Sequence, residues 1–333
     1  MKKYVNDPEE VVDEMLEGYL AAHGDRVRLL DESRVLVKNG APKEGKVGLV
    51  TGGGSGHKPA FIGYIGEGLM DAVAVGDIFS SPSAKQIYDA IKAVDGGEGV
   101  LCVLGNYSGD VMNFDMAAEM AGDEGIDVEQ VIGIDDVGSA PKEDREKRRG
   151  VAGEVVIWKM AGAKATQGGS LAEVKQAAEK ANFNSRSMGV AHSPCTVPAA
   201  GEPTFTLGEN EMEIGVGHHG EPGVEKTEMK SANETTDILM DKILEDLPFQ
   251  AGDDVLVLIN GLGATPLLEQ YIIERRVDRI LEKENINAYK TLVGDYFTSL
   301  EMAGFSITLT RLDEELKELV DEPAKSPLAN FVS

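Results

Sequence analysis

Short apolar segments and amphipathic segments alternate along the first half of the chain. Residues 46–51 and 71–75 are short and rich in β-prone side chains, and residues 99–104 are continuously apolar, as expected of a strand buried on both faces. Segments with apolar residues at helical spacing follow these runs, as at Ile87 and Ile91. The repeated order of strand, turn and helix predicts an α/β fold.

The periodicity breaks at residues 182–187 and then resumes in a second α/β pattern. Its predicted elements are a strand at residues 254–259, a helix at 266–282 and a strand at 305–309. A chain of 333 residues exceeds the size at which a single core stops growing, about 250–300 residues. We therefore expect two domains, residues 1–183 and 184–333, each with a mixed, largely parallel sheet flanked by helices. The C-terminal tail is free to pack back on the first domain.

Each predicted strand of the first domain ends in a polar turn, and these turns are rich in glycine. The turns are residues 52–59, 76–82 and 105–110. In parallel sheets that carry helices on both faces, ligands bind at the carboxyl ends of the strands. The three turns are therefore expected to meet at one cleft.

The composition narrows the classes of function. Hydrophobic residues make up 42% of the chain and charged residues 27%, which is typical of a globular protein and excludes a disordered or collagen-like one. The 58 acidic and 32 basic residues give a net charge of −26, which disfavours nucleic acid and anionic membranes as partners. The charge leaves two explanations open, a salt-rich cytoplasm and an acidic face that docks a basic partner.

The chain shows no sign of export or membrane insertion. No apolar run approaches the ~18 residues of a membrane span, and the first residues become acidic where a secretory signal would be apolar. Cys102 and Cys195 lie far apart, so they form neither a disulfide framework nor a metal-binding cluster. We expect a cytoplasmic protein.

The glycine-rich turn at residues 52–59 suggests an anion site but matches no standard nucleotide fingerprint. A Walker loop needs glycine directly before its lysine, whereas His57 precedes Lys58 here and Pro59 stands at the Ser/Thr position. His57 also occupies a glycine position of the dinucleotide-binding turn. Two interpretations remain, a close approach of the backbone to a ligand beside His57 and a tight turn with a solvated histidine.

Histidines occur in two glycine-rich turns, at His57 and at the adjacent pair His218 and His219. Because imidazole titrates near neutrality, these side chains can act as base, acid or nucleophile. If the second segment is extended, its two histidines point in different directions, and at most one faces the cleft. Zinc is disfavoured, because paired cysteines are absent and the adjacent histidines lack the four-residue spacing of a helical ligand pair.

Two further positions have both a structural and a functional interpretation. Asp110 stands at a predicted helix start, where it can cap the helix or, near a histidine from another turn, take a proton from a substrate hydroxyl. Ser80 and Ser81 precede Pro82, where their hydroxyls can cap a helix or hold a polar ligand. Spacing alone does not decide between these roles.

Together, these segments resemble the substrate-binding (K) subunits of dihydroxyacetone kinases. The matching segments are residues 52–59, 76–82, 95–101, 106–110, 195–201, 219–223, 260–266 and 304–309. They occur in order over nearly the whole chain, which makes the combination far more specific than any one segment. The resemblance implies a two-domain α/β homodimer that binds dihydroxyacetone.

The resemblance also implies a role for each site residue. The histidine of His-Gly-Glu-Pro-Gly, here His219, adds to the ketone to form a hemiaminal. His57 then hydrogen-bonds the adduct and assists its proton transfers, and Asp110 is the base for the terminal hydroxyl that is phosphorylated. Further substrate contacts are expected from Gly54, Ser55, Gly56, Lys58, Ser81 and Gly105, and no metal ligand is expected in this chain.

The family is divided by its phosphoryl donor. One kind carries an ATP-binding domain on the same chain, and the other uses a separate ADP-binding L subunit that is recharged through a phosphotransferase M-type protein. Because this chain lacks a nucleotide fingerprint, the resemblance indicates the second kind. We therefore expect no tightly bound cofactor in this chain, with ADP or ATP and magnesium in the L subunit. Phosphotransferase activity is expected only with that partner.

Three positions depart from the pattern of the family. Gly105 stands where a substrate-contacting lysine is common, so that contact is missing or replaced. Lys58 stands in place of a glutamate, and we hypothesise that it compensates by reaching the same cleft. His218 stands where an aliphatic residue is usual, which leaves His219 as the better nucleophile because it directly precedes Gly-Glu-Pro-Gly.

Two other functions remain open. Relatives of the family bind the triose as non-catalytic regulatory partners, and kinase chemistry could act on a related short-chain sugar, such as one with four carbons. The combination of His57, Asp110 and His219 favours catalysis, because binding alone has less need of a base at the hydroxyl.

Overall fold

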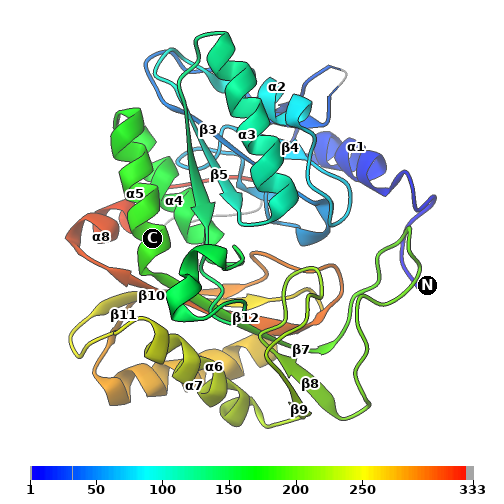
Figure 1. Cartoon of the computed structure of the whole chain (residues 1–333), viewed down its shortest axis with the longest axis vertical. Helices are drawn as coiled ribbons and strands as arrows, with labels where there is room; N and C mark the ends of the chain where they lie inside the picture. Colours follow the sequence, from blue (N-terminus) through cyan, green and yellow to red (C-terminus); the bar gives the residue numbers. More distant parts are fainter. Residues whose placement is uncertain (1, 32, 328–333) are drawn as a thin grey trace.

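The protein forms two six-stranded sheets that are stacked through a shared layer of helices (Figure 1). The structure is a computed structural model, and it describes residues 2–31 and 33–327. The strands of the first sheet are β1 (Val27–Leu29), β2 (Val35–Lys38), β3 (Gly48–Gly53), β4 (Ala72–Val75), β5 (Val100–Gly105) and β6 (Val128–Gly133). Those of the second are β7 (Ser185–Ser193), β8 (Glu211–Ile214), β9 (Glu225–Glu228), β10 (Asp254–Gly261), β11 (Asn287–Gly294) and β12 (Ala303–Leu312).

Both sheets are mixed, which confirms the predicted α/β class, but they differ in strand direction. The first has the order β1-β2-β4-β3-β5-β6, and its β4, β3, β5 and β6 run parallel. The second has the order β11-β10-β12-β7-β8-β9, and among its described strands only β10 and β11 are parallel. The expectation of a largely parallel sheet is therefore wrong for the second sheet. Parallel neighbours need a crossover connection, and helix α7 (Leu267–Glu284) provides one between β10 and β11.

The helices form three layers around the two sheets. The remaining α-helices are α1 (Val11–His23), α2 (Ala84–Val94), α3 (Ser108–Asp123), α4 (Glu154–Thr166), α5 (Leu171–Asn184), α6 (Ala232–Asp246) and α8 (Glu314–Asp321). Short 3-10 helices are η1 (Ser55–His57), η2 (Ile62–Tyr64) and η3 (Lys142–Lys147). Helices α2 and α3 cover the outer face of the first sheet, α6 and α7 cover that of the second, and α4 and α5 lie between the sheets (Figure 1).

Alternation along the central strands explains this layering, because successive side chains of a strand point to opposite faces. On β5, Leu101 and Val103 join the core around α4 and α5, whereas Cys102 joins the core around α2 and α3. On β10, Leu256 belongs to the shared core around α4 and α5, and Val257 packs with α6 and α7. The two halves of the chain therefore share one hydrophobic core.

Helix α4 is buried along most of its length, because both sheets pack against it. It carries Trp158, the single tryptophan of the chain, which is fully buried. The ammonium group of Lys159 donates a hydrogen bond to the carbonyl of Leu319, at the end of α8. Lys325 also pairs with Glu67 of the first half. The C-terminal segment thus returns to the first half of the chain, and the predicted division after residue 183 falls in the last turn of α5.

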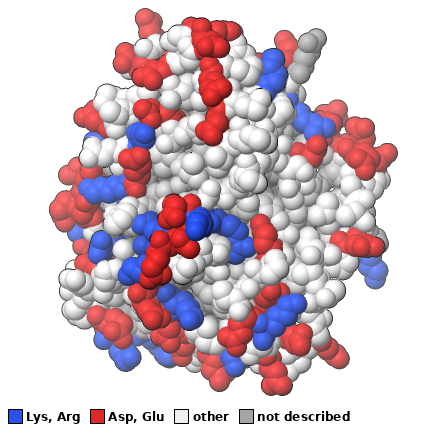
Figure 2. All heavy atoms as spheres, viewed as in Figure 1, with Lys and Arg blue, Asp and Glu red and all other residues white. Residues whose placement is uncertain are grey.

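No helix in the described part of the chain is long and apolar enough to cross a membrane. Acidic side chains are spread over the face shown in Figure 2, and most of the lysine and arginine groups on that face lie beside acidic ones. The view shows no extended basic area on that face.

Candidate functional site

A small pocket lies at the carboxyl ends of β3 and β5, where the two halves of the chain meet. It has a volume of about 20 Å³, room for roughly one water molecule. Its lining residues are Gly52, Gly53, Gly54, His57, Phe61, Gly105, Tyr107, Asp110, Glu154, His218, His219 and Phe297. The predicted turn at residues 76–82 reaches the same place through Phe79, whose ring stacks on His57 with centroids 5.0 Å apart. The expected convergence of three turns on one cleft is therefore confirmed.

The glycines of the first turn allow aromatic rings to pack directly on the backbone. A Cβ atom on Gly53 would lie 2.3 Å from the ring of Phe61, and one on Gly56 would lie 2.2 Å from the ring of Phe79. The second half of the chain fixes the same turn, because the N–H of Leu300 donates to the carbonyl of Gly56 over 2.8 Å. Glycine at these positions serves close packing around His57.

His57 is buried and held in one tautomer by its backbone partner. Its Nδ1 lies 2.8 Å from the carbonyl oxygen of Thr298, which can only accept, so Nδ1 carries a proton. Burial, and then the neighbouring His219 and His218, lower the pKa of His57 well below its ordinary value. In the neutral ring, Nε2 therefore presents a lone pair.

His219 is oriented by a carboxylate two residues further along the chain. Its Nδ1 lies 2.8 Å from Oε1 of Glu221, and its backbone N–H donates to Oε2 of the same group over 2.9 Å. Although burial opposes it, the hydrogen bond from His219 and its charge lower the pKa of Glu221 to about 2. The rings of Phe79 and Tyr107 make T-shaped contacts with the imidazole, with centroids 5.0 and 4.8 Å away. Because Glu221 pairs with Nδ1 of His219, Nε2 is the ring nitrogen that remains available to a ligand.

The two free nitrogens face each other, with Nε2 of His57 3.0 Å from Nε2 of His219. Both Nδ1 atoms are already protonated, so two neutral rings would place two lone pairs in contact. One additional proton turns this contact into a hydrogen bond. The short distance between the two Nε2 atoms therefore allows a proton to pass from one ring to the other.

Asp110 lies in the first turn of α3, where its carboxyl reaches the pocket. The N-cap position belongs to Tyr107, so Asp110 is not the capping residue. Burial raises the pKa of Asp110 to about 6, against the opposing effects of Ser81 and His219. Among the described residues, Oδ1 of Asp110 has no hydrogen-bond partner. This carboxyl can take up a proton near neutral pH.

The structure corrects the prediction that at most one of the adjacent histidines faces the cleft. Both His218 and His219 line the pocket. The segment is a tight turn rather than an extended strand, because the N–H of Gly220 donates to the carbonyl of Gly217 over 3.1 Å. Burial, together with His219, lowers the pKa of His218 to about 3, and neither ring nitrogen has a hydrogen-bond partner within the described chain.

Not all of the other predicted contact residues line the pocket. Gly54 lines it, whereas the hydroxyl of Ser55 points to the backbone and donates to the carbonyl of Gly76 over 2.7 Å. Gly56 packs on Phe79, behind the pocket wall. Ser81 is not among the described residues that line the pocket, but its side chain lies close enough to Asp110 to lower the pKa of that carboxyl.

Lys58 and Gly105, the two departures from the family pattern, are not neighbours across the pocket. Gly105 lines the pocket, but Lys58 is not among the described residues that do so. Burial lowers the pKa of Lys58 to about 7, and its ammonium nitrogen has no hydrogen-bond partner in residues 2–31 and 33–327. The residue that faces Gly105 is Glu154 instead.

Glu154 is the functional candidate that sequence reasoning missed. It opens α4, after residues 150–153, and its side chain is 1% exposed. Neither periodicity nor a motif marks this position, because the helix that follows is buried on all sides. A charged residue at the start of a helix with no polar face was the available signal.

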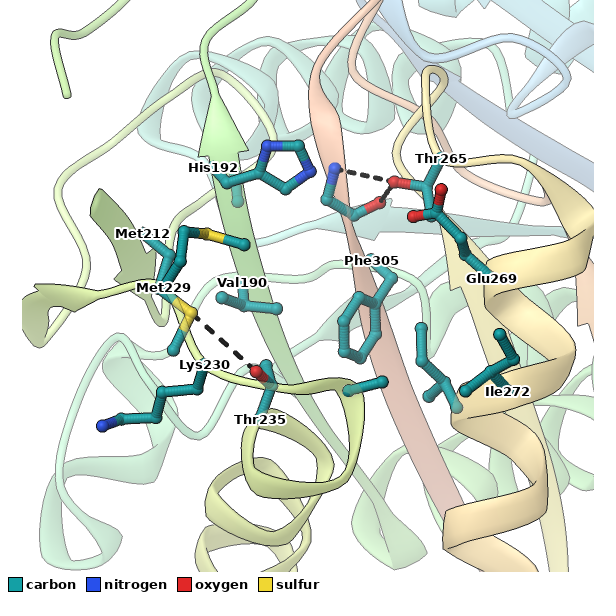
Figure 3. Close-up of a pocket in the computed structure, with 14 residues that line it drawn as sticks. Val190, His192, Met212, Met229, Lys230, Thr235, Thr265, Glu269, Ile272 and Phe305 are labelled. Atoms are coloured by element: carbon teal, nitrogen blue, oxygen red, sulfur yellow. Dashed lines mark hydrogen bonds between the residues drawn. The ribbon is translucent and has the colours of Figure 1, made fainter. Parts of the chain in front are cut away.

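A larger cavity lies elsewhere, between the second sheet and the starts of α6 and α7 (Figure 3). It has a volume of about 200 Å³ and none of the predicted site residues. Its walls are mostly apolar, with Met212, Ile272 and Phe305 among them. Its buried polar atoms are paired, as in the 2.6 Å hydrogen bond from the hydroxyl of Thr265 to the carbonyl of Gly304. No cluster of three or more His, Cys, Asp or Glu side chains suited to a metal ion occurs in the described residues.

Comparison with known proteins gives a consistent match over the whole chain. The Dak1 domain family matches residues 17–328. The chain is 50% identical over 328 residues to the dihydroxyacetone-binding subunit DhaK of PTS-dependent dihydroxyacetone kinase 2 from Listeria innocua, and the match covers 98% of each protein.

Solved structures show the same architecture. The dihydroxyacetone kinase of C. freundii superposes with a TM-score of 0.87 at 31% identity, over 99% of this chain and 60% of that one. The chain thus spans about 60% of the length of that kinase. Dha-DhaQ, a dihydroxyacetone kinase operon co-activator, superposes with a TM-score of 0.90 at 33% identity, over 98% of this chain and 99% of that one.

Proposed function

This chain belongs to the Dak1 domain family, and we propose that it is the dihydroxyacetone-binding subunit of a phosphotransferase-dependent dihydroxyacetone kinase. The observation that carries the proposal is the convergence of His57, Asp110 and His219 on one small pocket. A nucleophile, a proton relay and a base are the groups needed to capture a small ketone and activate its hydroxyl.

Substrate entry begins with the separation of the two imidazoles. The pocket volume of about 20 Å³ is too small for a triose while the Nε2 atoms of His57 and His219 are in contact. The carbonyl of dihydroxyacetone takes the place of this contact. Its oxygen then lies toward His57, and C2 lies toward Nε2 of His219.

The ketone is captured as a hemiaminal on His219. When the two imidazoles separate, the proton between their Nε2 atoms stays on His57, and the lone pair on Nε2 of His219 attacks C2. The π electrons of the carbonyl move to its oxygen, which takes the proton from His57. The alkylated ring of His219 keeps its Nδ1 proton toward the carboxylate of Glu221, which balances the positive charge. Polyols without a carbonyl cannot form this bond, so the reaction itself contributes to selectivity.

Asp110 then serves as the base for the terminal hydroxyl. With its pKa raised to about 6, the carboxyl is mostly ionised at pH 7 and still basic enough to accept the hydroxyl proton. The oxygen attacks the phosphorus of a donor that the L subunit brings, together with ADP or ATP and magnesium. We propose that this L subunit is recharged through an M-type phosphotransferase protein and that the present chain works as a cytoplasmic homodimer.

A second candidate function is that of a non-catalytic triose sensor. The observation in its favour is the likeness to the operon co-activator, which covers nearly all of both chains. The higher identity to a dihydroxyacetone-binding kinase subunit favours the catalytic role.

Reconstitution separates the two functions. The purified chain is mixed with the L subunit from the same genome, the recharging phosphotransferase proteins, phosphoenolpyruvate and dihydroxyacetone, and formation of dihydroxyacetone phosphate is followed. We expect turnover that requires this chain and falls about 100-fold or more in the Asp110→Asn variant. Binding of the triose without any phosphorylation would support the sensor, and absence of binding would contradict both functions.

A further inference from the structure

The carboxyl of Glu154 stands in the wall of the substrate pocket without a role in the steps above. Glu154 lines the pocket together with Asp110 and Tyr107, and its side chain is 1% exposed. Within the described residues, its Oε2 has no hydrogen-bond partner. A buried polar atom without a partner destabilises the folded protein, so its presence at a ligand pocket indicates that a ligand completes it.

Three glycines make the space that this carboxyl occupies. A Cβ atom on Gly105 or on Gly150 would lie 2.5 Å from Oε1 of Glu154, and one on Gly133 would lie 2.9 Å from its Cγ. Side chains at these positions would collide with the carboxyl. Glu154, at the start of α4, therefore fills the space beside Gly105.

A second unpartnered oxygen lies in the same pocket, on Asp110. Oδ1 of Asp110 and Oε2 of Glu154 are both buried, and both belong to residues of the pocket lining. A ligand with one hydroxyl can complete one of these oxygens. A ligand with two hydroxyls, such as dihydroxyacetone, can complete both.

We propose that Glu154 is a specificity-determining residue that binds a second hydroxyl of the substrate, distinct from the hydroxyl that Asp110 deprotonates. The proposal rests on the function proposed above, since it names a further contact within the same site. It assigns the pocket to short ketoses that carry a hydroxyl on both sides of the carbonyl.

The protonation state of Glu154 suits this role. Burial, and then the nearby carboxylates of Asp135 and Asp110, raise the pKa of Glu154 well above its ordinary value. A raised pKa favours the neutral carboxylic acid, which can both donate to and accept from a hydroxyl. A ketone that ends in a methyl group leaves Oε2 unpartnered, which disfavours its binding.

The test compares two ligands that differ by one hydroxyl. Dissociation constants for dihydroxyacetone and hydroxyacetone are measured by calorimetry at pH 7 for the wild-type chain, Glu154→Val and Glu154→Gln. We expect the wild type to prefer dihydroxyacetone by about tenfold, the scale of one hydrogen bond, and Glu154→Val to reduce this preference to about twofold or less. Glu154→Gln should keep most of it, because an amide can also donate and accept.

Glu274 provides a matched control. Its Oε2 is also buried and unpartnered among the described residues, and burial followed by the charge of Asp278 raises its pKa to about 7, but it lies on α7, away from the pocket. Glu274→Gln should leave the preference at its wild-type value. If Glu154→Val weakens both ligands equally and keeps the preference, Glu154 has only a structural role and the inference is wrong. If the wild type binds neither ligand, the proposed function fails instead.

Infrared difference spectroscopy gives a second readout that does not depend on the stability of Glu154→Val. Addition of dihydroxyacetone to the wild-type chain should shift the carbonyl stretch of a protonated carboxylic acid, and Glu154→Gln should remove that band. An unchanged band on ligand binding would overturn the inference.

Discussion

The substrate pocket and the larger cavity at α6 and α7 differ in size and in the state of their polar atoms. The pocket measures about 20 Å³ and the cavity about 200 Å³. The small pocket nevertheless holds unpartnered, buried atoms on Asp110, Glu154 and His218, whereas no residue that lines the large cavity carries such an atom in the described chain. In Figure 3 the hydroxyls of Thr235 and Thr265 are paired within the protein.

The difference teaches that unsatisfied polar groups locate this site better than empty volume does. An apolar cavity with paired polar atoms is compatible with folding alone. Buried carboxyls and imidazoles without partners destabilise the fold, so their concentration in one pocket has its explanation in the ligand that completes them. Substitutions in the substrate pocket are therefore expected to change binding or turnover, whereas substitutions in the wall of the larger cavity serve as controls.

The largest effect is expected for the removal of the nucleophile. His219→Ala should abolish covalent capture and all detectable turnover in the reconstituted kinase, because the nitrogen that forms the bond to C2 is removed. The matched control is His192→Ala, which alters the wall of the large cavity and should leave both unchanged. Full turnover of His219→Ala would show that the hemiaminal is not required.

Replacement of the base should separate binding from catalysis. Asp110→Asn is expected to lower turnover about 100- to 10,000-fold, while the dissociation constant of dihydroxyacetone changes only a few-fold. Steady-state kinetics and calorimetry on the same preparation measure the two quantities. A parallel loss of binding and turnover would contradict the role of Asp110 as the base.

The same variant should be more stable than the wild type at neutral pH. The pKa of Asp110 is 3.8 in the unfolded chain and about 6 in the folded one, so the folded state loses stability as the pH rises between these values. Above pH 6, Asp110→Asn removes this penalty, about 1–3 kcal/mol, and should raise the melting temperature. Below pH 4 the difference should vanish. The activity of the wild type should fall as the pH drops below about 6, because the base becomes protonated.

A smaller effect is expected for the orienting carboxylate. Glu221→Gln keeps a hydrogen-bond acceptor near Nδ1 of His219 but loses the negative charge that balances the alkylated ring. The dissociation constant of dihydroxyacetone should rise about tenfold, on the scale of a charge-assisted hydrogen bond. Calorimetry measures this change, and an unaltered affinity would show that the carboxylate only holds the turn.

The smallest effect is expected in the large cavity. Ile272→Ala removes an apolar side chain from its wall, far from the carboxyl ends of β3 and β5. We expect the affinity for dihydroxyacetone to stay within twofold of the wild type, within the usual range for an independent site. A marked loss of affinity would break the comparison, because it would couple the two regions.

The site was predictable from the sequence where local patterns carry the chemistry. Glycine-rich turns after apolar strands indicated His57 and Asp110, because the carboxyl ends of parallel strands meet at one edge. The orientation of His218 was not predictable, because it depends on a turn that the sequence does not distinguish from an extended segment. Glu154 reaches the pocket from a separate helix, and its role follows only from the space that Gly105 leaves.

In the fold, too, the features set by local sequence patterns were predictable, and those set by distant segments were not. The parallel strands of the first sheet were predictable, because each is a short apolar run that ends in a polar turn. Antiparallel pairs such as β7 with β12 join segments more than a hundred residues apart, and nothing local to either segment indicates its partner. The shared core around Trp158 likewise forms only when both sheets are in place.

The most direct test of the central claim is the carbon-13 spectrum of dihydroxyacetone labelled at C2 and bound to this chain. Capture by His219 converts C2 from a trigonal carbonyl to a tetrahedral carbon, so its resonance should move far upfield in the wild type. In His219→Ala it should stay at the position of the free ketone or its hydrate. A bound ketone that keeps its carbonyl resonance in the wild type would contradict the account.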